Sequence, residues 1–177
     1  ILSHDRLEGQ GDGRRLYNSM YMMQNGEVTQ TYDKMKLAPF GEYFPMETLL
    51  KPLKDFFFGN ALLFTPGTTP LVFEYNGLKI APLICFESSV SEIIRERVLM
   101  GANVRVTASN ESWFGQSLGR HQRYAMDIVH SVEYGRYMLR VTQDGITALI
   151  TPQGRRLDVF PEKRFYFKDV QFTPAHG

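Results

Sequence analysis

The stretch that decides the fold is PLVFEYNGLKIAPLICFESSVSEIIRERVLMG, residues 70–101. Asn76-Gly77 separates two apolar runs, and this pattern is the strongest short signal of a β-hairpin. The second run, residues 78–85, is apolar almost throughout, which indicates a strand buried on both faces. The stretch Ser89–Glu92 then fits a capping box, which predicts the start of a helix, and Gly101 predicts its end.

The flanking sequence predicts further strands and one longer helix. Asn-Gly at 25–26 and Gln-Gly at 153–154 predict two more hairpins, and further strands are expected at residues 103–109, 139–143 and 164–172. We expect a helix over residues 118–138, with one buried face formed by Ala125, Ile128, Val129 and Val132. Residues 5–15 are polar and glycine-rich and predict a loop, whereas residues 47–58 predict one or two helical turns.

Strands that alternate with helices predict an α/β domain in which helices cover at least one sheet. The sequence has 177 residues, which suits one ordinary domain, and it contains no internal repeat and no low-complexity boundary. We therefore expect a single domain over residues 1–177. The longest uncharged run, residues 56–73, contains two prolines and two glycines, so it does not predict a membrane-spanning helix.

The composition excludes several functional classes. The 20 basic and 19 acidic residues leave a net charge of +1 and form no basic stripe, so nucleic acid is not an expected partner. Cys85 is the single cysteine, which rules out an internal disulfide and a zinc site of several thiolates. The four histidines show no metal-binding spacing, and we expect neither a metal nor a cofactor.

Cys85 is the first candidate for chemistry, because it ends an apolar strand and lies four residues before the predicted helix cap. Ligands bind at the carboxyl ends of strands in open α/β sheets. Helix N-termini and nearby cations lower the pKa of thiols in general, and the thiolate is the nucleophile. The alternative is a small buried apolar residue without a chemical role.

Four charged residues could act with a thiolate. Lys34 and Lys36 fall on the same side of a predicted strand, where a lysine could stabilise an oxyanion. The alternative, which the residues alone favour, is that both lie on a solvated strand edge. Glu42 and Glu87 could be acid or base groups, and Glu87 lies two residues after Cys85. For either glutamate, a solvated carboxylate is the ordinary alternative.

An aromatic pair, Trp113-Phe114, follows the predicted strand that ends near residue 110. Such a pair could line a pocket, or it could belong to the core.

Three motifs occur in order along the chain: YDKMKLAPFGEYFP at 32–45, ICFE at 84–87 and SNESWFG at 109–115. With Tyr17-Asn18-Ser19 and GRxxxR at 135–140, they resemble the nitrilase (carbon–nitrogen hydrolase) superfamily. The residues within these motifs are most similar to the apolipoprotein N-acyltransferase branch of that superfamily. The resemblance extends from about Leu16 to Thr173.

The resemblance implies an αββα sandwich and a Glu–Lys–Cys triad. It implies that Cys85 is the nucleophile, that Lys34 is the triad lysine, and that Glu42 and Glu87 are further essential carboxylates. The backbone N–H of Phe86, which stands where the family usually has Tyr, is an expected oxyanion donor. Among residues that contact the substrate, the resemblance implies Trp113 and Phe40.

The chain also departs from the family pattern. The triad glutamate precedes the lysine by far more than the 33 residues available here, so we expect it outside this sequence, together with the first strands of the sandwich. The transmembrane bundle that flanks the domain in the family is also absent. The sequence starts at Ile1, and we expect it to be an excerpt from a longer protein. After Gly119 the family usually reads P-x-Q-H, whereas this chain has Arg120-His121-Gln122-Arg123.

The activity implied is transfer of a fatty acyl chain from a phospholipid donor, through a thioester, to the N-terminal amine of a diacylglyceryl-cysteine lipoprotein. The implied setting is the outer, periplasmic face of the bacterial cytoplasmic membrane. Contact with that membrane is expected through the flanking helices and through the apolar loop 40–64, because exposed apolar clusters mark lipid or partner surfaces. The fragment alone is expected to be inactive, because it lacks the general base.

Two alternatives remain open from the sequence. One is a soluble nitrilase-type amidase acting on a small amide, which would not need the apolar loop 40–64. The other is a nitrilase-like binding module without catalysis, which a reactive Cys85 would exclude.

Overall fold

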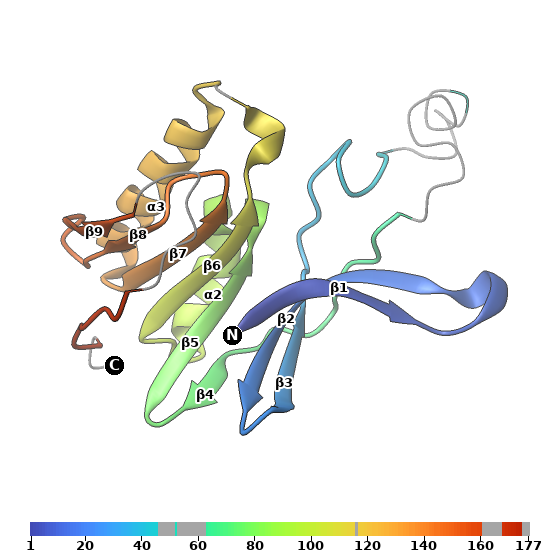
Figure 1. The fold of residues 1–177 in the computed structure, drawn as a ribbon, viewed down its shortest axis with the longest axis horizontal. Helices are drawn as coiled ribbons and strands as arrows, with labels where there is room; N and C mark the ends of the chain where they lie inside the picture. Colours follow the sequence, from blue (N-terminus) through green and yellow to red (C-terminus); the bar gives the residue numbers. More distant parts are fainter. Residues whose placement is uncertain (46–51, 53–62, 116, 161–167, 175–177) are drawn as a thin grey trace. The chain divides into compact units, whose positions relative to one another are not determined.

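The computed structural model describes residues 1–45, 52, 63–115, 117–160 and 168–174 (Figure 1). The chain divides into two compact units, residues 1–69 and residues 70–177. Within the described ranges, no helix is both long enough and apolar enough to cross a membrane.

The first unit is an antiparallel meander of three strands, β1 (Leu2–Glu8), β2 (Arg15–Gln24) and β3 (Glu27–Asp33). A short 3₁₀ turn, Gly11–Gly13, lies between β1 and β2. The predicted hairpin between β2 and β3 is confirmed: Asn25 and Gly26 both have positive φ, as a tight turn between twisted strands requires. Alternation along the strands brings Met20, Met22 and Tyr32, all buried, to one face of this sheet.

The prediction of a loop over residues 5–15 is wrong for its first part, because β1 continues to Glu8. Leu2 to Glu8 pair residue by residue with Tyr21 to Arg15 of β2. The strand is mostly exposed, so its side chains show no apolar alternation from which it could have been predicted. Cross-strand contacts stabilise it instead: the Arg6 guanidinium lies 4.4 Å from the centre of the Tyr17 ring.

The second unit is a six-stranded mixed sheet in the order β4-β5-β6-β7-β8-β9. Its three central strands, β5 (Leu78–Ile84), β6 (Val104–Asn110) and β7 (Tyr137–Gln143), are parallel to one another. The remaining strands, β4 (Phe73–Tyr75), β8 (Ala148–Ile150) and β9 (Arg156–Val159), pair antiparallel. The two helices, α2 (Ser91–Leu99) and α3 (Gly119–Tyr134), lie on the same side of this sheet (Figure 1).

An apolar core joins these helices to the sheet. Leu83 of β5 and Met138 of β7, both fully buried, pack with Ile94 of α2 and Tyr124 of α3. The hairpins predicted around Asn76-Gly77 and Gln153-Gly154 are confirmed, as are the strand near 103–109 and the helix after Ser89.

Two expectations about local structure are not met, and a third falls almost entirely outside the described residues. The capping box is wrong, because Val90 is the N-cap of α2 and no side chain caps it. A 3₁₀ turn, η2 (Cys85–Ser89), occupies the residues just before it. The strand predicted over 164–172 is not formed in its described part, residues 168–172, and the helical turns predicted over 47–58 lie outside the described residues except for Pro52.

The predicted buried face of the long helix is wrong at three of its four residues; the fourth, Ile128, is partly buried and packs against the core. Val129 and Val132 are more than half exposed and Ala125 is exposed, whereas the buried face consists of Arg123, Tyr124, Asp127, His130 and Ser131. The helix ends earlier than predicted, at Tyr134, where Gly135 adopts the left-handed conformation. A polar face can be buried here because its partners on the sheet are charged as well.

Candidate active site

Lys34 lies directly after β3, and its side chain is fully buried. Its Nζ donates to Glu42 Oε2 at 2.6 Å. The same carboxylate accepts hydrogen bonds from Asn18 Nδ2 at 3.0 Å and from the Ala38 N–H at 2.7 Å. Burial of this ion pair is possible because three donors satisfy the carboxylate.

The returning segment 63–69 fixes the backbone on both sides of this ion pair. The Phe64 N–H donates to the carbonyl of Glu42 at 3.0 Å, and the Gly67 N–H donates to that of Lys34 at 2.8 Å. Position 67 requires glycine, since a Cβ there would lie 2.8 Å from the carbonyl carbon of Asp33. Lys34 is therefore not on a solvated edge. It is buried, whereas Lys36 is exposed, so the two predicted lysines lie in different environments.

Cys85 directly follows the last residue of β5 and begins the turn η2, which agrees with its predicted position at the end of an apolar run. Its φ is +50°, which is strained for a residue with a side chain. Glu87 in the same turn is fully buried, and its Oε2 accepts the N–H of Ile84 at 2.9 Å. Glu87 thus fixes the turn that bears the thiol, and Phe86 is the second residue of that turn.

Arg123 of α3 reaches the sulfur of Cys85. Its Nη1 donates to Sγ at 3.3 Å and to the Ser109 hydroxyl at the end of β6, also at 3.3 Å. The arginine is 8% exposed, and the Phe114 ring lies 5.7 Å from its guanidinium carbon. Sequence reasoning missed this residue, because a charged side chain opposite the predicted apolar stripe of a helix indicates a solvated face.

A buried ion network continues from Arg123 into the sheet. Glu111 lies 3.5 Å from Arg123 and also pairs with Arg140 of β7, which in turn binds Asp127 of α3. Arg105 of β6 donates to the hydroxyl of Ser131 at 2.7 Å and to the backbone carbonyl of Asp127 at 3.3 Å. Burial lowers the pKa of Arg105 to about 10, although the charge of Asp127 opposes this shift. Burial also raises the pKa of Asp127, against the opposing charges of Arg140 and Arg105.

The predicted substrate contacts lie on the surface of their units. Trp113, in the short turn Ser112–Phe114, is 89% exposed, so the interpretation of this residue as core is wrong. Phe40 is 61% exposed and has a positive φ of 61°. Its ring meets that of Phe44 edge to face at 5.5 Å. Within the apolar loop 40–64, residues 46–51 and 53–62 lie outside the described part of the chain.

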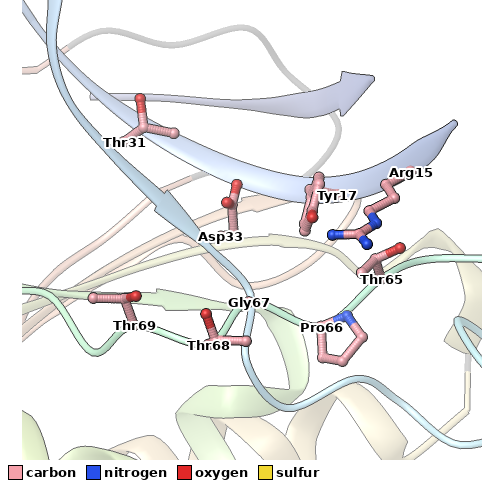
Figure 2. Close-up of a pocket in the computed structure, with 9 residues that line it drawn as sticks. All are labelled: Arg15, Tyr17, Thr31, Asp33, Thr65, Pro66, Gly67, Thr68 and Thr69. Atoms are coloured by element: carbon pink, nitrogen blue, oxygen red, sulfur yellow. The ribbon is translucent and has the colours of Figure 1, made fainter. Parts of the chain in front are cut away.

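A polar pocket of about 340 Å³ in the first unit was not predicted (Figure 2). Residues 65–69 form one side of it, and side chains of β2 and β3 form the other. Its carboxylate, Asp33, is held by Arg6 Nη2 at 2.7 Å and by the Ser19 hydroxyl at 2.6 Å. None of the predicted catalytic residues lines this pocket, which comes from segments that no sequence motif connects.

The network around Arg140 yields a stability prediction. Arg140→Met should lower the free energy of unfolding by ~3–5 kcal/mol at neutral pH, because Glu111 and Asp127 would remain buried without their shared cation. Asp127, whose pKa burial already raises, stabilises the folded state most at low pH, and that contribution is lost as the pH rises through its folded-state value. The loss in the free energy of unfolding caused by Arg140→Met should therefore become smaller as the pH is lowered.

Urea denaturation at several pH values measures this, with the exposed Arg95→Met as control. A loss for Arg140→Met no larger than that of the control would contradict the role given to the network.

Comparison with solved structures supports the fold. The chain matches a glutamine-dependent NAD⁺ synthetase from Acinetobacter baumannii with a TM-score of 0.69, at 18% identity, over 92% of this chain and 29% of that one. It matches a carbon–nitrogen hydrolase from Helicobacter pylori with a TM-score of 0.65, also at 18% identity, over 88% and 56% of the respective chains. The predicted α/β class and nitrilase fold are confirmed.

Curated relatives named apolipoprotein N-acyltransferase match the chain over most of its length. Those of Azotobacter vinelandii and Pseudomonas aeruginosa are 36% and 37% identical over 97% and 94% of this chain, and that of Vibrio parahaemolyticus is 30% identical over 97%. The chain spans about a third of the length of these relatives, 33%, 32% and 35% respectively. The family model described as carbon-nitrogen hydrolase matches residues 2–164. Together with the strand-end cysteine and the buried lysine–glutamate pair, this match establishes that the chain belongs to the carbon–nitrogen hydrolase family.

Proposed function

We propose that this chain is part of the catalytic domain of an enzyme that transfers a fatty acyl chain from a phospholipid to the N-terminal amine of a diacylglyceryl-cysteine lipoprotein. The observation that carries the reaction class is the geometry of Cys85, whose sulfur lies at a strand end with a buried guanidinium 3.3 Å away. The substrates are proposed from the curated relatives, whose name specifies N-acylation of an apolipoprotein.

The first half-reaction forms a thioester. The thiolate of Cys85 attacks the ester carbonyl carbon, a carbon–sulfur bond forms, and the carbonyl oxygen becomes an oxyanion. Lys34 and the backbone N–H of Phe86 are the proposed donors to that oxyanion. When the oxyanion collapses, the ester carbon–oxygen bond breaks, and the lysophospholipid leaves as an alcohol after it takes the proton that the thiol gave to the general base.

The second half-reaction transfers the acyl group to nitrogen. The amine of the lipoprotein attacks the thioester carbonyl, the carbon–nitrogen bond forms, and the carbon–sulfur bond breaks to restore the thiolate. The proton lost by the amine goes to the general base, which the family resemblance assigns to a glutamate outside residues 1–177. A covalent intermediate lets two bulky substrates use the site in turn, which gives ping-pong kinetics.

Within this scheme, Glu42 and Glu87 are proposed to position the reacting groups. Glu42 holds the ammonium of Lys34 through the 2.6 Å ion pair, and Glu87 holds the turn that presents Cys85. Trp113 and Phe40, both exposed, are proposed to contact the acyl chains. The proposed setting is the outer face of the bacterial cytoplasmic membrane, with residues 40–64 turned toward the lipid.

The covalent intermediate is the first test. Incubation of the full-length protein with phospholipid, but no acceptor, should add the mass of one acyl group to the peptide that contains Cys85, and hydroxylamine should remove it. Cys85→Ser should lose the adduct, because an alkoxide is far harder to form than a thiolate. Acyl transfer by Cys85→Ala at the parental rate would instead mean direct attack of the amine on the ester. Hydrolysis of small amides with no acyl transfer would favour the amidase alternative.

The lysine is the second test. Lys34→Ala should slow thioester formation by at least about 10²-fold, because the oxyanion loses its charged donor. Lys36→Ala removes the same charge two residues away from an exposed position, and we expect it to leave the rate within about twofold. Quantitative mass spectrometry of the Cys85 peptide over time measures both rates. Equal rates for the two variants would remove Lys34 from the mechanism.

A further inference from the structure

We infer that Arg123 is a further catalytic residue, which keeps Cys85 as a thiolate by direct contact with its sulfur. This inference rests on the proposed function only in taking Cys85 as the nucleophile. It concerns a residue that the Glu–Lys–Cys triad implied by the family does not include. At position 123, moreover, this chain has an arginine where the P-x-Q-H pattern of the resemblance has histidine.

The contact itself is the first observation. Arg123 Nη1 donates to Cys85 Sγ at 3.3 Å, within the range of a hydrogen bond to sulfur, and the guanidinium is more than nine-tenths buried. A cation held 3.3 Å from a sulfur favours the anionic form of that sulfur, and it does so more strongly where water is excluded. An arginine supplies this charge at every physiological pH, which a histidine does not.

The rest of the buried network leaves this charge without full compensation. The connected cluster contains the three guanidinium groups of Arg105, Arg123 and Arg140 against the two carboxylates of Glu111 and Asp127. Glu111 accepts a much closer contact from Arg140 than the 3.5 Å separation from Arg123, so the carboxylate that Arg123 meets is held mainly by Arg140. A thiolate at Cys85 balances the remaining positive charge.

The unsatisfied donors of Arg123 lead to the same conclusion. Its Nε and Nη2 are buried and have no hydrogen-bond partner among the described residues. Buried donors without partners are costly, and a structure keeps them where an anion compensates them. Besides Glu111 at 3.5 Å, the group in contact with Arg123 that can carry negative charge is the sulfur of Cys85, at 3.3 Å.

The orientation of Arg123 is fixed from several sides. Ser109 accepts a second hydrogen bond from Nη1 at 3.3 Å, Phe114 lies against the guanidinium, and α3 holds the backbone through Asp127 and its bond to Arg140. A fixed donor needs no rearrangement when charge develops on the sulfur, which is the condition for effective electrostatic stabilisation.

The test is the rate at which iodoacetamide alkylates Cys85 in the full-length protein, measured by peptide mass spectrometry from pH 5.5 to 9.5. No lipid or lipoprotein is present, so the result does not depend on the proposed substrates. Cys85 of the Arg123→Gln variant should be alkylated at least about tenfold more slowly than Cys85 of the parent protein at pH 6–7. The reason is that an opposite charge within ~4–6 Å generally shifts the pKa of an ionisable group by one unit or more. The two rates should converge near pH 9.5.

Two further variants keep the test decisive. Arg123→Lys retains the charge and should stay within about threefold of the parent, which separates loss of charge from loss of structure. Arg95→Gln removes an exposed arginine from α2 and should match the parent at every pH. If Arg123→Gln folds and follows the parental profile, the inference is wrong. If Arg123→Gln does not fold, a tenfold loss in Arg123→Lys with the fold retained would equally overturn it.

The acyl-transfer experiments decide a separate question. A parent protein that shows the Arg123-dependent alkylation profile but forms no acyl adduct would retain the inference and reject the proposed substrates. If Arg123→Gln forms the acyl adduct at the parental rate, the proposed substrates are retained and the inference about Arg123 is rejected.

Discussion

The ion pairs of Arg140 with Glu111 and Asp127 are the interaction on which the second unit depends. All three side chains are fully buried, and they come from β7, from the residue after β6 and from α3. Taking them out of water costs several kcal/mol per charge unless every charge is paired. The pairing therefore fixes the helix to the sheet at one register, and Gly145 leaves room for it: a Cβ there would lie 2.9 Å from the carboxyl carbon of Glu111.

The position of the candidate nucleophile follows from that constraint. With α3 held through Asp127, its residue Arg123, one turn earlier, reaches over the carboxyl ends of β5 and β6 to Cys85 and Ser109. In the first unit, the buried pair of Lys34 and Glu42 has an equivalent role, because the segment that returns at Phe64 and Gly67 fixes the backbone of both residues. In each unit, buried charges thus hold one candidate site residue in place.

Much of the fold could be predicted from the sequence, because its signals were local. Two hairpins turn at Asn-Gly and a third turns at Gln153-Gly154, and each of these turns is a short-range pattern. The buried parallel strand just before Cys85 is a short-range pattern as well. β1 and the buried face of α3 could not be predicted in the same way. The side chains of β1 are mostly exposed, and α3 buries Arg123 and Asp127 while it exposes Val129 and Val132, so apolar periodicity pointed to the wrong face.

The candidate site divides along the same line. Cys85, Lys34, Glu42 and Glu87 stand in motifs that the sequence displays, and the structure gives Lys34, Glu42 and Glu87 buried polar partners. Arg123, Glu111 and Arg140 act through contacts between elements far apart in the chain, and such contacts have no sequence signature. The buried charges around Cys85 come together only when β5, β6, β7 and α3 pack against one another in the folded chain.

The central claim is that the buried charges of the second unit hold Arg123 against the sulfur of Cys85. A crystal structure of the full-length Arg140→Met variant tests it through one distance, from Arg123 Nη1 to Cys85 Sγ, which is 3.3 Å when the network is intact. The account predicts that this contact is lost in the variant, because α3 is no longer held to β7 through Asp127. A folded variant that keeps the contact at its original distance would contradict it.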